Sequence, residues 1–191
     1  LEVMFGVVKA GACVVPLSGL LTGEQLAGLL NNSGAVAAPA TSEFIDKLQG
    51  HLDAAPALRA DARVVVHGEA EGWLPYDAWQ QGVSSDTPPV TYSPDDAFNI
   101  IYSSGTTGLP KGIVQTHRAR THWAVSNGLE MGFTDQARAL TTTALYSNGT
   151  WLMMLPVLFA GGTCVVMPSF DAAEFLRTAQ DERISHSFLV P

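Results

Sequence analysis

The sequence has little positive charge, few cysteines and no long hydrophobic run. Lys and Arg number 10 against 18 Asp and Glu, which gives a formal net charge of −8. Such an acidic balance argues against non-specific nucleic-acid binding, which needs basic patches, although it leaves room for a local phosphate site. The best apolar run, residues 151–160, is shorter than the roughly 20 residues of a membrane-spanning helix and contains Pro156. We therefore expect no transmembrane segment and no nucleic-acid partner.

Only two cysteines occur in the 191 residues, Cys13 and Cys164, and each lies in a short apolar segment. That setting is typical of free thiols buried in a core. It predicts a reducing compartment, for which we take the cytoplasm, and it gives no support to a disulfide framework or a metal site. The five histidines add no spacing that is typical of metal ligands.

One segment, residues 102–112, gathers small hydroxyl residues, glycines and a lysine more densely than any other part of the chain. Glycines let backbone N–H groups come close to a ligand, hydroxyls donate further hydrogen bonds, and a lysine adds a positive charge. Apolar runs at 97–102 and 112–116 predict a strand on each side. The segment therefore suits a polyphosphate. Its polar and glycine residues are Ser103, Ser104, Gly105, Thr106, Thr107, Gly108, Lys111 and Gly112.

The composition of this segment allows two other interpretations. An ordinary surface turn has the same Gly, Ser and Thr composition, and this alternative stays open on composition alone. A Walker A loop also combines glycines with a lysine, but that motif has Gly before the lysine and Ser or Thr after it. Here Pro110 precedes Lys111 and Gly112 follows it, so the Walker interpretation fails.

Helical and strand patterns alternate along the whole chain. Helices are expected at 2–10, 22–31, 42–48, 75–81, 118–131, 149–159 and 171–181, and strands at 12–17, 35–38, 63–66, 97–102, 112–116, 139–143, 163–167 and 185–190. Thr22 and Gln25 have the spacing of a capping box, and segment 84–94 has the Ser, Pro and Asp content of a linker. The alternation predicts an α/β fold with a largely parallel sheet covered on both faces.

An internal similarity links residues 7–16 with residues 157–168. In both segments an apolar helix ends at Ala-Gly and a Cys-Val-Val run follows. The similarity predicts two similar α/β units, with chance likeness between helix–glycine–strand junctions as the alternative.

With these features placed, residues 103–112 resemble the phosphate-binding signature of the adenylate-forming (AMP-binding) superfamily of acyl-CoA synthetases, peptide-synthetase adenylation domains and luciferases. Segments 9–17, 112–118 and 160–162 are similar to other parts of that family. The resemblance implies two similar helix-covered, largely parallel sheet units within a large N-terminal adenylation domain. Because there is no initiating Met and later family segments are missing, we interpret residues 1–191 as a partial domain without its start or the C-terminal domain.

The resemblance implies an acid–thiol ligase, an acyl-CoA synthetase of the kind that serves fatty acid metabolism. Such enzymes use ATP, with Mg²⁺, to convert a carboxylic acid to an acyl-adenylate, and coenzyme A then takes the acyl group. By family position, Lys111 and Thr106 are the expected catalytic residues, and Thr106 is the expected contact to the metal. We expect the loop to be mobile, because pyrophosphate must leave. The residues expected around the phosphates are Ser103, Ser104, Gly105, Thr106, Thr107, Gly108 and Lys111.

The acid pocket is expected at residues 143–151. By the same resemblance, Ser147 stands where the family commonly has a His near the acyl carboxylate, and Tyr146 stands at a Phe. Amino-acid-activating members of the resembled family carry an Asp in this segment that binds the substrate ammonium. No acidic residue lies between Asp135 and Asp171 here, so the resemblance argues against an α-amino acid substrate. The aromatic candidates are equally typical of a core. The residues expected to line the pocket are Tyr146, Ser147, Asn148 and Trp151.

Two rival functions remain at this level. A peptide-synthetase-type adenylation domain is disfavoured because segment 143–151 lacks the Asp that amino-acid-activating members of the resembled family carry there. A non-catalytic nucleotide-binding module is the rival from another class. Because family segments are missing, we expect the 191 residues alone to be inactive. The expected partners are the acid, ATP and coenzyme A, and a homo-oligomer is left open. His117 is expected to have a structural role as a polar cap where a strand meets a helix.

Overall fold

The computed structural model describes residues 1–103 and 110–190. The chain forms two compact units, Leu1–Thr91 and Tyr92–Pro191. The boundary between them falls inside segment 84–94, which has the composition of a linker. Among the described residues, no helix combines the length and the apolar content needed to cross a membrane.

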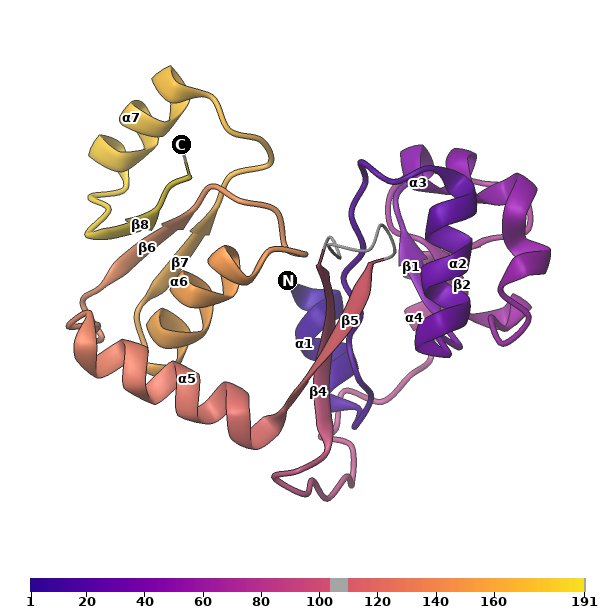
Figure 1. Cartoon of the computed structure of the whole chain (residues 1–191), viewed down its shortest axis with the longest axis horizontal. Coiled ribbons are helices and arrows are strands. Elements are labelled where there is room, and N and C mark those ends of the chain that lie inside the picture. The colour runs from indigo at the N-terminus through magenta and orange to yellow at the C-terminus, as the bar shows by residue number, and fades with distance from the viewer. Residues whose placement is uncertain (104–109, 191) are drawn as a thin grey trace. The chain divides into compact units, whose positions relative to one another are not determined.

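The first unit is built around a small parallel sheet (Figure 1). Its strands pair in the order β1-β2-β3. Helices α2 and α3 supply half of the buried apolar side chains of its core, including Leu26, Leu30 and Ile45, which pack with Val65 and Trp73. The elements of this unit are α1 (Glu2–Lys9), α2 (Gly23–Ser33), β1 (Ala38–Ala40), α3 (Ser42–Leu48), η1 (Gln49–Ala54), η2 (Ala60–Ala62), β2 (Arg63–Val65), β3 (Leu74–Pro75) and α4 (Tyr76–Gln80).

Local signals at the ends of α2 are confirmed. The hydroxyl of Thr22 accepts a hydrogen bond from the backbone N–H of Gln25, and the side chain of Gln25 accepts one from the N–H of Thr22. This capping box satisfies two of the N–H groups that a helix start leaves without a partner.

The second unit combines an antiparallel hairpin with a second parallel sheet (Figure 1). Strands β4 and β5 form the hairpin, and three strands pair in the order β7-β6-β8. Helix α6 packs on all three strands of this sheet, and helix α5 lies beside α6. The elements are β4 (Ala97–Ser103), β5 (Lys111–Thr116), α5 (His117–Glu130), β6 (Arg138–Thr141), α6 (Asn148–Phe159), β7 (Thr163–Val166), α7 (Ala172–Asp181) and β8 (His186–Phe188).

The internal similarity holds for the helix ends and fails for one of the strands. Gly11 follows α1 with φ of +80°, and Gly161 follows α6 with φ of +81°. Both helices therefore end at a residue in the left-handed conformation, which favours glycine. The Cys-Val-Val run at 164–166 forms part of β7 beside β6. In the expected strand 12–17, by contrast, Val14 alone forms a bridge, so that prediction is wrong. A strand needs a neighbour to take up its ladder hydrogen bonds, and the apolar run alone does not supply one.

Two further expectations need correction. The expected strand at 35–38 lies at Ala38–Ala40, and the short strand β3 was not predicted. Both cysteines are free, but they are half-buried and not fully buried, and Cys13 lies outside any strand.

Helix α7 has no buried residue, so the sheet of the second unit receives its main cover from α6.

Candidate functional site

The segment that suits a polyphosphate connects the two strands of the hairpin. Ser103 at the end of β4 is paired in register with Lys111 at the start of β5, and Tyr102 is paired with Gly112. The expected strand-to-strand setting is therefore confirmed. A Cβ atom on Gly112 would lie 3.1 Å from Cε1 of Tyr102, so the missing side chain makes room for that ring.

The structure places the two ends of the expected phosphate loop. Ser103 is half-buried, whereas Lys111 is exposed. Within the described part of the chain, Lys111 takes part in no ion pair. The ammonium group of Lys111 is therefore available to bind an anionic ligand such as a phosphate. The other residues expected at the phosphates lie outside the described residues: Ser104, Gly105, Thr106, Thr107 and Gly108.

The residues expected to line the acid pocket lie at the start of α6, and the first turn of that helix fixes the preceding segment. The buried hydroxyl of Thr150 lies 2.6 Å from the carbonyl oxygen of Thr143 and 2.7 Å from that of Ala144. One hydroxyl proton is shared between these acceptors. Ser147 caps the helix, because its side chain accepts a hydrogen bond from the N–H of Gly149. The segment 143–147 is thereby tied to the helix that follows it.

The four expected pocket residues fall into two groups. Tyr146, Ser147 and Asn148 are half-buried at the helix start. Trp151 is only 1% exposed, and its indole N–H donates to the carbonyl of Leu145 at 2.9 Å. The ring of Trp151 also makes an edge-to-face contact with Phe98, with centroids 5.8 Å apart. Trp151 therefore lies in the core, whereas the other three reach the surface.

Arg120 on α5 is a residue that sequence analysis missed. Its side chain is 2% exposed, and its guanidinium lies 4.6 Å from the ring of Trp123 and 4.9 Å from that of Trp151. Nε donates to Oδ1 of Asn99 at 2.8 Å, and Nη2 donates to Oδ1 of Asn148 at 3.1 Å. Burial lowers the pKa of Arg120 to about 10, because the charged form loses its hydration. Arg120 thus joins β4, α5 and the start of α6.

One sequence signal pointed to Arg120. Trp123 follows three residues after it, so the two side chains share a face of the helix. The buried partners Asn99 and Asn148 lie 21 and 28 residues away in the chain, and no local pattern identifies them.

His117 has a packing role, although it is not the cap that its position suggested. Its ring lies 5.1 Å from that of Tyr92 and 5.1 Å from that of Phe98, measured between centroids. The cap of α5 is Thr116, whose side chain accepts a hydrogen bond from the N–H of Ala119. Throughout residues 1–103 and 110–190, no group of three or more His, Cys, Asp or Glu side chains is placed to hold a metal ion.

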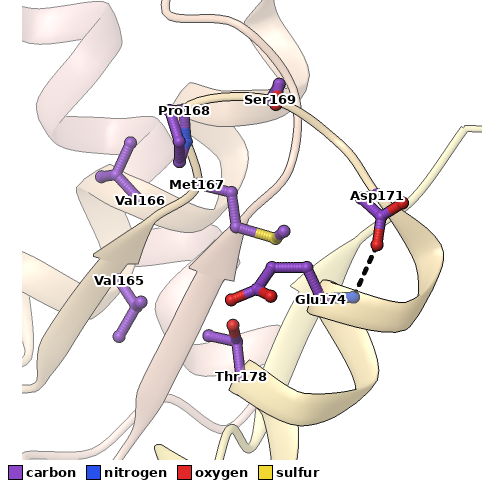
Figure 2. Close-up of a pocket in the computed structure, with 8 residues that line it drawn as sticks. All are labelled: Val165, Val166, Met167, Pro168, Ser169, Asp171, Glu174 and Thr178. Carbon is purple, nitrogen blue, oxygen red and sulfur yellow. Dashed lines mark hydrogen bonds between the residues drawn. The ribbon is translucent and has the colours of Figure 1, made fainter.

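A cavity of about 320 Å³ lies apart from the expected site, between the end of β7 and α7 (Figure 2). Figure 2 shows the side chains of Met167, Glu174 and Thr178 pointing towards one another across it. Asp171 also lines the cavity, and its carboxylate accepts a hydrogen bond from the N–H of Glu174 as the cap of α7. None of the residues that sequence analysis placed at a site lines this cavity.

A family model and the related proteins of known name all point to the same family. The model of a family described as AMP-binding enzyme matches residues 1–191. The chain is 31% identical over 193 residues to a feruloyl-CoA synthase of Amycolatopsis sp, covering 100% of this chain and 36% of that protein. It is 30% identical over 197 residues to an indoleacetate–CoA ligase of Aromatoleum aromaticum, covering 100% of this chain and 37% of that protein.

A solved structure agrees with these relatives. The crystal structure of an anthranilate CoA ligase in complex with anthranoyl-AMP superposes with a TM-score of 0.89 at 26% identity. The match covers 97% of this chain and 36% of that chain. The chain described here thus spans little more than a third of the length of the proteins that it matches.

Proposed function

Because the chain belongs to the AMP-binding enzyme family, we propose that it is part of an ATP-dependent acid–thiol ligase. In the first step an oxygen of the acid's carboxylate attacks the α-phosphorus of ATP. The bond from that phosphorus to the bridging oxygen breaks, and pyrophosphate leaves with the electron pair. In the second step the sulfur of coenzyme A attacks the acyl carbon of the adenylate, loses its proton, and AMP leaves. The product is a thioester.

The single observation that carries this proposal is the match of the whole chain to the family, residues 1–191. The hairpin supports it. Ser103 and Lys111 are paired at the neck of the loop, and the exposed ammonium of Lys111 has no carboxylate partner in the described part of the chain. A positive charge at this position would stabilise the negative charge that develops on the departing pyrophosphate.

The loop residues outside the described residues complete the proposed phosphate site. Backbone N–H groups of Gly105 and Gly108 and the hydroxyls of Ser104, Thr106 and Thr107 would donate to phosphate oxygens. We assign the Mg²⁺ that accompanies ATP to the hydroxyl of Thr106. These assignments follow the positions of the residues in the sequence motif.

The acid is proposed to bind at the start of α6. Tyr146, Ser147 and Asn148 are half-buried there and carry hydroxyl and amide groups. The names of the two relatives at 30–31% identity include feruloyl and indoleacetate. We therefore propose an aromatic or acyl carboxylic acid as the substrate class, with aromatic acids tested first.

The test is acid-dependent exchange of labelled pyrophosphate into ATP, measured on the full-length protein with a panel of aryl, short-chain and fatty acids. Lys111→Ala is expected to reduce the exchange rate by about 100-fold or more, since one charged donor to the leaving group is lost. Lys111→Arg keeps the charge and is the matched control, with a smaller expected loss. A wild-type protein that binds ATP but shows no exchange with any acid would instead be a non-catalytic nucleotide-binding module.

A further inference from the structure

Arg120 is a buried cation without a carboxylate partner. It is 2% exposed, and within the described residues none of the ion pairs includes it. Its Nη1 atom is buried and has no hydrogen-bond partner there. Buried charges in proteins are nearly always paired, because the loss of hydration is costly. This network therefore retains an unbalanced positive charge.

The guanidinium fixes the orientation of the amide of Asn148. Arginine carries donors only, so the group that faces Nη2 at 3.1 Å must be the amide oxygen of Asn148. The amide nitrogen of Asn148 is consequently turned away from Arg120. In the part of the chain that the structure describes, this nitrogen makes no hydrogen bond of its own and is not among the buried unpaired atoms. Two N–H donors of a half-buried residue are thus presented at the helix start.

Asn99 shows that the guanidinium imposes the same orientation on its other partner. Its amide oxygen accepts from Nε of Arg120, and its own Nδ2 is left buried and without a partner. A buried unpaired N–H group costs about 1–3 kcal/mol. The two amides therefore differ: Nδ2 of Asn99 is buried and unpaired, whereas Nδ2 of the half-buried Asn148 is not among the buried unpaired atoms.

The start of α6 favours an anion. The helix has 12 residues and begins at Asn148, so its dipole places partial positive charge beside that amide. Arg120 remains protonated at neutral pH, since burial lowers its pKa only to about 10. None of the ion pairs among the described residues includes Arg120, so no described carboxylate neutralises its guanidinium by direct contact.

We propose that Arg120 is a positioning residue for the acid substrate: it turns the amide N–H groups of Asn148 towards the substrate carboxylate and supplies positive charge behind them. This inference rests on the ligase function proposed above. It assigns Asn148 to bind the carboxylate of the acid substrate and Arg120 to orient Asn148. Any acid that binds at Asn148 would be recognised through its carboxylate group. Arg120 itself is too enclosed for direct contact, because two indole rings flank its guanidinium within 5 Å.

The same enclosure holds the guanidinium of Arg120 and the amide of Asn148 in fixed positions. The guanidinium is held by two amide oxygens and by the rings of Trp123 and Trp151. A donor whose partner is locked in this way binds its ligand with little loss of side-chain entropy. The site therefore presents its donors before the acid arrives.

The test compares Arg120→Met with Arg118→Met in pyrophosphate exchange by the full-length enzyme. Arg118 is the matched control, because it lies on the same helix with its side chain 64% exposed and pairs with Asp95 at the surface. Arg120→Met is expected to raise KM for the acid by about 10-fold or more, the value of one lost charge-assisted interaction, while KM for ATP changes less than about twofold. Arg118→Met is expected to leave both unchanged.

Two further variants keep the proposal testable if Arg120→Met does not fold. Asn148→Asp keeps an oxygen that accepts from Arg120 but replaces the N–H donors with a carboxylate, which repels the carboxylate of the substrate. Of all these variants, it should raise KM for the acid the most. Asn99→Asp places a carboxylate against Nε of Arg120 and removes the unpaired Nδ2. The positive charge of Arg120 is then neutralised, so KM for the acid should rise although the melting temperature does not fall. A merely structural role for Arg120 would leave KM unchanged in Asn99→Asp.

The outcomes separate the two proposals. If the wild type exchanges pyrophosphate and the folded variants keep KM for the acid within about twofold, the positioning role is overturned and the ligase function stands. If the wild type shows no exchange with any acid, the ligase function is wrong and the positioning role falls with it. If KM for the acid rises while KM for ATP stays constant, both hold.

Discussion

Replacing Gly162 with Ala should destabilise the second unit, because the turn from α6 to β7 has no room for a methyl group. A Cβ atom at this position would lie 2.8 Å from Cγ2 of Val157 and 3.1 Å from the carbonyl oxygen of Thr134, and closer still to that of Ala137. Real Cβ contacts below 3.0 Å essentially do not occur. The oxygen of Ala137 cannot simply retreat, since it accepts a hydrogen bond from the N–H of Thr163 at 2.9 Å.

The size of the effect follows from these contacts. Overpacking a well-packed site costs about 1–3 kcal/mol, and losing the hydrogen bond at the start of β7 adds roughly 1 kcal/mol. The matched control is Gly128→Ala in α5, where the nearest atom, Cβ of Pro156, would be 3.9 Å away. That variant should gain up to about 1 kcal/mol, because Ala is a better helix former than Gly.

The assay is hydrogen–deuterium exchange of peptides that cover β7, together with the thermal unfolding midpoint. Gly162→Ala should exchange faster in β7 and unfold at least about 4 °C below wild type. Gly128→Ala should unfold at or above the wild-type midpoint. A Gly162→Ala variant with unchanged β7 exchange and an unchanged midpoint would refute the steric argument.

Three other predictions concern the helix starts and one thiol. Thr150→Val should lower stability by about 1–3 kcal/mol and raise KM for the acid, because the carbonyls of Thr143 and Ala144 lose their donor, and Thr150→Ser should restore both. Thr22→Ala should lower stability by about 1 kcal/mol in denaturant titrations, since the capping box is lost, and an unchanged midpoint would contradict this. Burial raises the pKa of Cys164 to about 11, so its thiolate fraction at pH 8 is low. Alkylation of Cys164 should therefore be roughly 100-fold slower than that of a free thiol, with the rate rising through pH 9 to 11, and a rate equal to that of free cysteine would refute it.

Elements that depend on neighbours in the sequence were predicted well. Helix α3 begins and ends where the pattern placed it, and the capping box of α2 is present. The unit boundary falls in the expected linker, and the glycine-rich segment joins two strands. These features rest on backbone conformations and hydrogen bonds within a few residues, so the local sequence carries the information.

Partners that lie far apart in the chain were not predictable in this way. The same Cys-Val-Val pattern forms β7 at one place and a single bridge at Val14 at the other, because within the described residues β7 pairs with β6 over four positions and the earlier run has no such ladder. Trp151 was a pocket candidate by position, yet its indole lies in the core.

The sequence by itself determined the α/β class, the hairpin setting of the polar loop and the family. The tertiary structure alone decided that Arg120 is buried between two indoles and that it orients Asn148. The physical reason is that the energy of a buried charge depends on everything packed around it. Those groups come from β4, α5 and α6, whose approach is set by packing and not by any local run of residues.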